Sequence, residues 1–427
     1  MSESSKPGEH EGSLGLAQGT ALYIASVLGT GILVLPGIAA GAAGPASLIS
    51  VVAVFILSIP LAGTFAALAA RFPDPGGVAS YARTALGDTV ARIAGYLFYF
   101  GVSAGAPIVG VLGAEYVVAV LGVDRAIIPW LTIVMIAIPF TLNLFGVKVS
   151  GSAQMGLTAL LMIVVVGVVA LGFPAVQQEN FSPFMPHGWI GVGTAISLFV
   201  WAFAGWEVGT HIAGEFKNPR RVIPLATAIA AIVVGIAYIA LQWVTIGVLG
   251  DKAGEGAVPL LSLVNQTAPR WGAIAVAIVA AIVSVGVMNA YFPAFGKLGA
   301  ALGRDGDLPT WFAKGADANT IPRRSLMVVL ALASIYFTVL WFQDFYLGNL
   351  ILLHTSSMVA IYVIGMIAAV KILDTYTLGW WMAVVASVLS IGLFILAGAN
   401  MGVPLFLAVI AIIITFVKRR RAQKRSS

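Results

Sequence analysis

The sequence predicts an all-α integral membrane protein with about twelve transmembrane helices. Of its 427 residues, 60% are hydrophobic and 9% are charged, whereas charged residues make up about 25% of a soluble globular domain. Long uncharged segments recur along the whole chain, and the basic residues fall in the short stretches between them. Such a chain cannot cover a surface that faces water, so we expect a single membrane domain.

The hydrophobic segments are each long enough to cross about 30 Å of hydrocarbon. Two of them share the uncharged stretch of residues 12–70, which the turn-forming sequence at 41–45 divides. Further segments fall near residues 90–121, 126–146, 152–173, 189–213, 223–250, 270–300, 324–343 and 347–371. The last two lie within residues 375–417 and are separated by a break at 398–404.

We expect the membrane domain to cover residues 14–417. Residues 1–13 contain acidic residues and no short hydrophobic core, unlike a cleavable signal peptide, so the first hydrophobic segment is expected to be retained. Residues 418–427 form a basic tail. Because the formal net charge of +6 lies in short loops and in this tail, it indicates membrane topology and not nucleic-acid binding.

The basic residues predict that both termini lie in the cytoplasm. With an even number of helices, all but three of the 23 lysines and arginines fall on the side of the N-terminal tail, and the exceptions are Arg125, Lys252 and Arg270. Outside the two tails, the residues assigned to the inner side are Arg71, Arg83, Arg92, Lys148, Lys217, Arg220, Arg221, Lys297, Arg304, Lys314, Arg323, Arg324 and Lys371. Cytoplasmic loops carry such an excess, so we expect a multi-pass protein of a bacterial inner membrane.

Several functional classes are disfavoured by missing motifs. The chain has no cysteine, which excludes disulfides, thiolate metal sites and cysteine nucleophiles. A His-Glu-x-x-His motif and paired aspartates within hydrophobic segments are absent, so an intramembrane enzyme is not expected. A channel would need a ring-forming polar filter, and a receptor would need a sizeable soluble domain; the chain offers only short loops.

Two hydrophobic segments contain helix-breaking glycines near their middle. The first has Gly29-Thr30-Gly31, and the segment at 189–213 has Gly205 followed by Gly209. These segments open two possible five-helix repeats, and paired interrupted helices are the best sequence indication of a transporter binding site. The alternative is that glycines let helices pack closely. We prefer that alternative for Gly95, Gly101, Gly105 and Gly110.

The polarity of the two breaks predicts a receptor for an α-amino acid. If the first segment runs outward, the N–H groups of Gly31 and Ile32 open a half-helix and suit a substrate carboxylate. The segment at 189–213 runs inward, so carbonyl groups end its outer half at the break and suit a substrate ammonium. These carbonyls belong to Trp201, Phe203 and Ala204, and Val27 adds one from the first segment.

The same residues resemble the signatures of the amino acid–polyamine–organocation superfamily. Its Gly-x-Gly and Gly-x-Glu breaks correspond to Gly29-Thr30-Gly31 and Gly205-Trp206-Glu207, and its cytoplasmic loops are similar to residues 75–81 and 215–224. The sequence Gly15-Leu-Ala-Gln-Gly19 and the chain length look like the amino-acid efflux branch, which exports methionine and branched-chain amino acids.

The resemblance implies a fold with two inverted five-helix repeats, at about 14–173 and 189–371, followed by two extra helices at about 375–417. It implies that Thr30, Gly31 and Ile32 bind the carboxylate and that Val27, Trp201 and Ala204 bind the ammonium. It also implies that aromatic residues, here Trp201 and Tyr291, close over the substrate during alternating access.

Glu207 is an ionisable residue at a helix break, which makes it a functional candidate. We expect it to sense protons or gate transport, and the structural alternative is that it accepts hydrogen bonds from N–H groups at the start of the inner half-helix. Some proton-coupled relatives carry a lysine in the fifth helix, but residues 152–173 contain none and Lys148 precedes them. Ser284 alone gives little support for a sodium site, so we expect a proton gradient, no metal and no cofactor.

Other polar residues in the hydrophobic segments have structural interpretations. We expect Glu115 to be structural and His211 and His354 to form hydrogen bonds between helices. Asn289 either lines the pocket or bridges helices.

The predicted function is secondary active transport of neutral amino acids, in the direction of efflux, with methionine and branched-chain amino acids as substrates. Apart from Glu207, no charged side chain is aimed at the predicted pocket, so a charged substrate side chain would be poorly paired there. The alternative is an uptake permease or an amino-acid exchanger with the same site. The expected partners are small neutral amino acids and the lipid bilayer.

Overall fold

The computed structural model describes residues 14–146, 151–256, 258–268, 271–317, 320–345 and 347–426. The predictions for the tail of residues 1–13, Lys148 and Arg270 therefore lie outside the described residues. Within this part the fold is helical throughout and contains no strand, only one isolated bridge between Leu14 and Phe216.

The helices follow the predicted hydrophobic segments closely. They are α1 Leu16–Leu28, α2 Gly31–Ala43, α3 Ser47–Arg71, α4 Val78–Leu86, α5 Asp88–Tyr96, α6 Gly105–Leu121, α7 Ile128–Leu144, α8 Gly151–Gly172, α9 Gly188–Ala202, α10 Val208–His211, α11 Pro219–Leu249, α12 Pro259–Thr267, α13 Trp271–Arg304, α14 Arg323–Phe342, α15 Gly348–Ile372, α16 Leu378–Ala397 and α17 Gly402–Ser426. Short α4 and α12 lie in connections that the hydrophobicity pattern did not assign.

Ten helical segments of the described chain are long and apolar enough to cross a membrane. The first, Leu16–Arg71, has 56 residues and combines α1, α2 and α3, while α9 is a shorter apolar helix of 15 residues. The all-α membrane fold is thus confirmed. Twelve crossings and the inverted repeat stay predictions.

Large apolar side chains cover the outside of the helix bundle. Ile163 is 67% exposed, Val388 67% and Ile395 72%. Many further isoleucine, leucine, valine and phenylalanine side chains of the helices are also exposed, whereas large exposed apolar surfaces are rare on soluble monomers. Lipid is therefore the natural surrounding of this surface.

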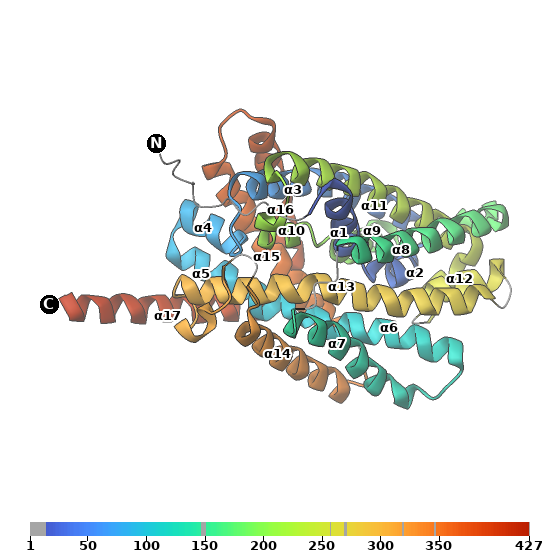
Figure 1. Ribbon diagram of the computed structural model, residues 1–427. Helices are drawn as coiled ribbons and strands as arrows, with labels where there is room; N and C mark the ends of the chain where they lie inside the picture. Colours follow the sequence, from blue (N-terminus) through green and yellow to red (C-terminus); the bar gives the residue numbers. More distant parts are fainter. Residues whose placement is uncertain are drawn as a thin grey trace, which may run out of the picture.

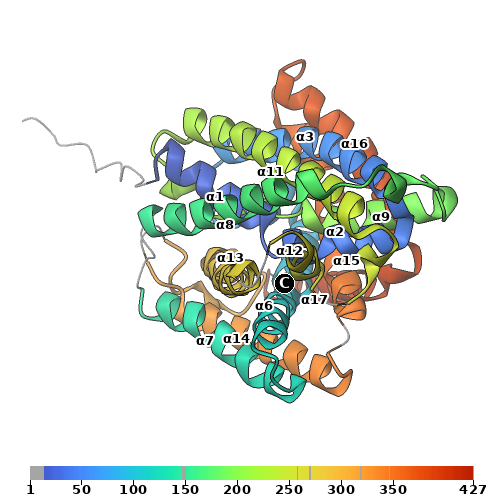
Figure 2. The same cartoon turned by 90° about the vertical axis from the view of Figure 1, so that its right-hand side faces the viewer.

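The long helices run along a common direction, and the interrupted ones lie inside the bundle (Figure 1). In this arrangement α1 packs against α11 and α8, α2 against α9, and α13 against α6 and α7. The view along the helices shows α13 beside α6 (Figure 2), and α13 also packs against the interrupted α1. The two predicted breaks are thereby brought into the interior.

A charge network gathers several of the predicted inner-side residues at one end of the bundle. The carboxylate of Asp307, which is fully buried, pairs with Arg83 and with Nη2 of Arg92 at 2.8 Å. Arg92 also contacts Thr415 of α17, and Lys418 contacts the Gly306 carbonyl. The loop after α13 therefore joins α4, α5 and α17 on one face, where α17 projects from the bundle (Figure 1).

Candidate functional site

The first membrane segment is interrupted at Gly29 and Thr30, between α1 and α2. Gly29 has a φ of 40°, a backbone conformation that favours glycine. Gly31 has a different constraint, because a Cβ atom there would lie 2.6 Å from the Tyr238 hydroxyl oxygen. That hydroxyl donates to the Leu28 carbonyl at 3.0 Å. The break falls at the predicted residues, and Tyr238 satisfies one of the carbonyls it frees.

The second interruption separates α9 from α10 and lies directly against the first. Gly205 has a φ of 124°, and a Cβ atom there would lie 2.7 Å from the Ser26 carbonyl oxygen. A side chain at this position is therefore excluded both by conformation and by space. The two breaks touch through main-chain atoms.

Glu207 lies behind the breaks and is fully buried. Its Oε2 accepts hydrogen bonds from the Gly205 N–H at 3.1 Å and from the Tyr362 hydroxyl at 3.0 Å, while Oε1 has no hydrogen-bond partner among the described residues. The structural alternative expected this side chain to accept hydrogen bonds from the N–H groups that start α10, but it forms no such cap. The backbone turns at Gly205, so the N–H of Gly205 faces the carboxylate in place of those of α10.

A cavity of about 60 Å³ opens at the crossing of the two breaks, which is room for a few water molecules. Seven of the predicted residues line it: Val27, Gly29, Thr30, Gly31, Trp201, Ala204 and Tyr291. Trp201 and Tyr291, expected to close over a substrate, thus stand at the same cavity as the helix breaks.

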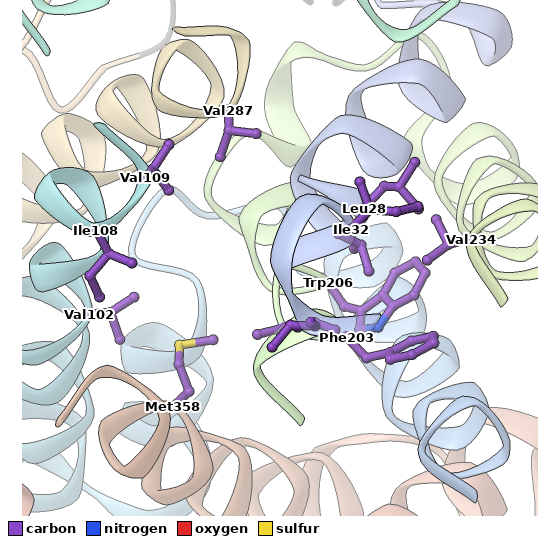
Figure 3. Close-up of a cluster of buried hydrophobic side chains, with 14 of the residues drawn as sticks. Leu28, Ile32, Val102, Ile108, Val109, Phe203, Trp206, Val234, Val287 and Met358 are labelled. Carbon is purple, nitrogen blue, oxygen red and sulfur yellow. The ribbon is translucent and has the colours of Figure 1, made fainter. Parts of the chain in front are cut away.

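Three other predicted site residues, Ile32, Phe203 and Gly205, do not line the cavity, and neither does Glu207. The Phe203 ring lies 5.2 Å from the Tyr238 ring and 6.3 Å from Phe55, between centroids. Figure 3 shows Ile32 and Phe203 within a buried cluster together with Leu28 and Trp206. Their side chains fill the core because the chain turns away from the cavity at the break.

Comparison with known proteins decides the family. The amino acid permease family model matches residues 14–425, nearly the whole chain. This chain belongs to the amino acid permease family. It is a membrane transporter of amino acids and not an enzyme.

Three relatives of this permease illustrate its neighbourhood. It is 31% identical over 403 residues to an uncharacterized amino acid permease, YecA, of Bacillus subtilis, with 94% of each chain covered. It is 29% identical over 394 residues to the L-methionine/branched-chain amino acid exporter YjeH of Escherichia coli, covering 90% of this chain and 91% of the relative. It is 30% identical over 322 residues to the branched-chain amino acid permease BcaP of Bacillus subtilis, covering 70% and 69%.

The cavity of the permease has further walls that the sequence did not indicate. They come from α6 and the turns before it, from α13 and α14, and from α15, and comprise Val102, Ser103, Gly105, Ala106, Val109, Val287, Met288, Phe292, Phe295, Val329 and His354. Figure 3 shows Val102 and Val109 across from Leu28 and Ile32. The third hydrophobic segment, residues 90–121, thus faces the breaks across the cavity.

The third segment is itself irregular beside the cavity. A π-helical turn spans Leu97–Gly101 and a 3-10 turn spans Val102–Ala104, before α6 begins. Gly101 and Gly105 serve close packing, as expected: a Cβ atom would lie 2.3 Å from Ser357 Oγ at the former and 2.9 Å from the His354 ring at the latter. The glycines on either side of Ser103 were the signal that the sequence offered for this wall. Glycine spacing alone, however, does not distinguish close helix packing from the wall of a binding site.

The remaining polar candidates form hydrogen bonds between elements. Nδ1 of His211 lies 3.0 Å from the Pro75 carbonyl oxygen, and Nδ1 of His354 lies 3.0 Å from that of Val102. Asn289 accepts from Asn143 at 3.0 Å and is not a lining residue, so it bridges α13 and α7. His354 thus joins α15 to the segment that leads into α6, as expected, and also lines the cavity. His211 of α10 instead bonds to the loop between α3 and α4 and not to another helix.

Glu115 and Ser284 have partners away from the cavity. Glu115 forms an ion pair with Arg125. Ser284 donates to the Ala280 carbonyl at 2.9 Å within α13. Among the described residues, no group of three or more histidine or acidic side chains could hold a metal ion.

The chemistry of the cavity wall is apolar with a few neutral polar groups. None of its lining residues is an aspartate, glutamate, lysine or arginine. Within the described chain, no backbone hydrogen bond outside the helices engages the N–H groups of Gly31 and Ile32, which open α2 and lack partners within it. The site can therefore offer main-chain dipoles at one end and apolar contacts at the other.

Proposed function

We propose that this permease carries out secondary active transport of neutral amino acids by alternating access, exporting methionine and branched-chain amino acids. The observation that carries the proposal is the cavity at two touching helix breaks, whose lining contains no charged side chain. A zwitterion can be held there by the main chain, and its side chain meets apolar residues.

The main chain supplies the hydrogen-bonding groups for both charges of the substrate. The N–H groups of Gly31 and Ile32 stand at the positive end of α2 and bind the carboxylate. The carbonyl groups of Val27, Trp201, Phe203 and Ala204 surround the ammonium. Phe203 and Ile32 can take part through their backbone although their side chains belong to the core.

The apolar wall favours an apolar substrate side chain. Valines 102, 109, 287 and 329, with Met288, supply dispersion contacts and no counter-charge. A lysine or glutamate side chain would leave a charge unpaired in a low-dielectric site, at a cost of several kcal/mol. The names of two relatives, an exporter of methionine and branched-chain amino acids and a branched-chain amino acid permease, support the same substrate class.

The direction and the driving force extend the proposal. Export follows the likeness to the Escherichia coli exporter, which covers 90% of the chain; uptake or exchange is the alternative, supported by the Bacillus subtilis permease. Proton movement drives the cycle, without a cofactor or a sodium ion, and Glu207 is the proton-sensing or gating group. The protein lies in the bacterial inner membrane with twelve crossings, an inverted repeat and cytoplasmic termini.

Counterflow in proteoliposomes tests the proposal. Vesicles loaded with one unlabelled amino acid should take up labelled methionine, leucine, isoleucine or valine, and an imposed pH gradient should alter the rate. Lysine, arginine and glutamate inside the vesicles are the matched controls and should support no exchange. Robust arginine or glutamate exchange without methionine exchange would contradict the substrate class, and an unchanged rate under the pH gradient would contradict proton coupling.

A further inference from the structure

The wall of the cavity opposite the helix breaks contains several hydrogen-bonding groups. They lie at the irregular part of the third hydrophobic segment, residues 90–121. The π-helical and 3-10 turns at 97–104 disturb the regular helical pattern, and side chains from other helices bind carbonyls there. The Tyr336 hydroxyl donates to the Phe100 carbonyl at 2.6 Å, and His354 bonds to the Val102 carbonyl at 3.0 Å. Such π-turns inside helices occur frequently at functional sites.

The bond to Val102 determines which nitrogen of His354 carries a hydrogen. A carbonyl oxygen can only accept, so Nδ1 is the donor, and in the neutral ring Nε2 keeps a lone pair. Nε2 makes no hydrogen bond with the described residues. It is also not one of the fully buried side-chain nitrogen or oxygen atoms that lack a partner. Because His354 lines the cavity, an unpaired ring nitrogen is available at this part of the wall.

The surroundings hold the ring in this position. Gly105 faces it so closely that a Cβ atom would lie 2.9 Å from its Cε1 atom. Ser103, in the same wall, uses its hydroxyl hydrogen on the Phe100 carbonyl at 3.0 Å, which leaves its oxygen as an acceptor as well. This wall of the cavity thus offers acceptors and few donors.

We propose that His354 is a specificity-determining residue whose Nε2 accepts a hydrogen bond from the substrate side chain, so that the permease also transports hydroxyl amino acids, above all threonine. This inference rests on the proposed transport of neutral amino acids. Threonine has nearly the shape of valine, so it fits a site for branched-chain substrates. Its hydroxyl can donate to Nε2, whereas a purely apolar site would make it pay the cost of losing water.

The comparison of threonine with 2-aminobutyrate isolates the hydroxyl, because the two differ only by that group. In counterflow of labelled valine, threonine should compete about five to ten times better than 2-aminobutyrate, the gain expected from one hydrogen bond. If valine is exchanged but threonine competes no better than 2-aminobutyrate, the inference is wrong while the proposed function stands. If no neutral amino acid is exchanged, the proposed function itself fails.

Variants then assign the effect to Nε2. His354→Asn keeps a nitrogen donor for Val102 but removes the distal acceptor, so the advantage of threonine should be lost. His354→Gln restores an oxygen near the position of Nε2 and should retain the advantage. His211→Asn is the matched control, because that histidine also bonds to a backbone carbonyl but does not line the cavity.

The ratio of the two competitors is the readout, so a general loss of transport rate does not obscure it. A ratio unchanged in His354→Asn would overturn the role of His354, as would an equal loss in His211→Asn. Should His354→Asn not fold, the wild-type ratio and Ser103→Ala remain decisive. With His354 intact, Ser103→Ala should leave most of the advantage, and its complete loss would assign the acceptor to Ser103 instead.

Discussion

Gly205 is held by two independent constraints, a φ of 124° and the Ser26 carbonyl oxygen 2.7 Å from the place of a Cβ atom. A residue other than glycine would have to leave this conformation or displace the first break. The contact between the breaks is the part of the site most sensitive to a single atom.

Gly205→Ala is predicted to destabilise the protein by about 1–3 kcal/mol through backbone strain and to abolish counterflow. Thermal unfolding in detergent and methionine counterflow measure the two effects. Gly193→Ala is the control, because it lies in α9 of the same segment and a Cβ atom there meets nothing within 4 Å. Near-normal transport by Gly205→Ala would show that contact between the breaks is not required.

Glu207→Gln is predicted to flatten the pH dependence of transport while substrate binding is kept. Glutamine retains an oxygen for the Gly205 N–H and Tyr362 but cannot gain or lose a proton. Transport rates from pH 5 to 8, with methionine binding measured separately, provide the test. Glu115→Gln changes a carboxylate that pairs with Arg125 away from the cavity, so its pH profile should match the wild type.

At the residue scale, the positions of the breaks were predictable and the directions of the side chains were not. Glycines and a glutamate in a hydrophobic segment are visible in sequence, and Gly29, Gly31 and Gly205 lie at the breaks. Whether Phe203 points into the cavity or into the core depends on Phe55 and Tyr238, which come from α3 and α11. No local pattern contains that information.

The loop between α3 and α4 shows how a connection is fixed to its neighbours. Asp74 accepts from the Gly76 N–H at 2.8 Å and from the Ser80 hydroxyl at 2.6 Å, and it pairs with Arg304 at 3.1 Å. Burial alone would raise the pKa of Asp74, but the hydrogen bonds from Ser80 and Gly76 and the charge of Arg304 outweigh burial and lower the pKa.

Asp74→Asn is therefore predicted to lower the thermal unfolding temperature at pH 7. A carboxyl group whose pKa is lower in the folded state stabilises the protein above its unfolded pKa of about 3.9, and this stabilisation is lost as pH falls through the folded pKa. The difference between wild type and variant should shrink from pH 7 towards pH 3 in detergent. A difference that stays constant over this range would contradict the assignment.

At the element scale, hydrophobicity predicted the long helices and missed the irregular turns. The segment expected at 90–121 is α5, a π-turn, a 3-10 turn and α6, because Tyr336 and His354 from distant helices stabilise its carbonyls. Helix α12 was missed because its nine residues are too short to appear as a membrane segment.

At the scale of the whole molecule, the distribution of charge and the packing agree. Arg83, Arg92, Arg304 and Lys418 were all assigned to one side by the positive-inside rule, and they contact one loop, Asp305 to Asp307, or its neighbours. Composition and charge were therefore enough to predict the class of protein and that these four basic residues lie on one face. The walls of the cavity required the fold, since they come from six hydrophobic segments.

The central claim is that a neutral amino acid binds in the cavity where the breaks cross. Because the natural chain contains no cysteine, a single cysteine in the cavity wall can report occupancy without background labelling. Ala106→Cys places the thiol in the lining, and Lys252→Cys places one at an exposed position of the 3-10 turn Gly250–Gly254 as a control.

The rate at which a methanethiosulfonate reagent labels each variant, with and without substrate, is the most direct test. Saturating methionine should slow labelling of Ala106→Cys about tenfold, the protection expected when about nine-tenths of the sites are occupied, whereas lysine and glutamate should not. Labelling of Lys252→Cys should be unaffected by any of them. An Ala106→Cys variant that transports methionine but is labelled at the same rate with and without it would contradict the account.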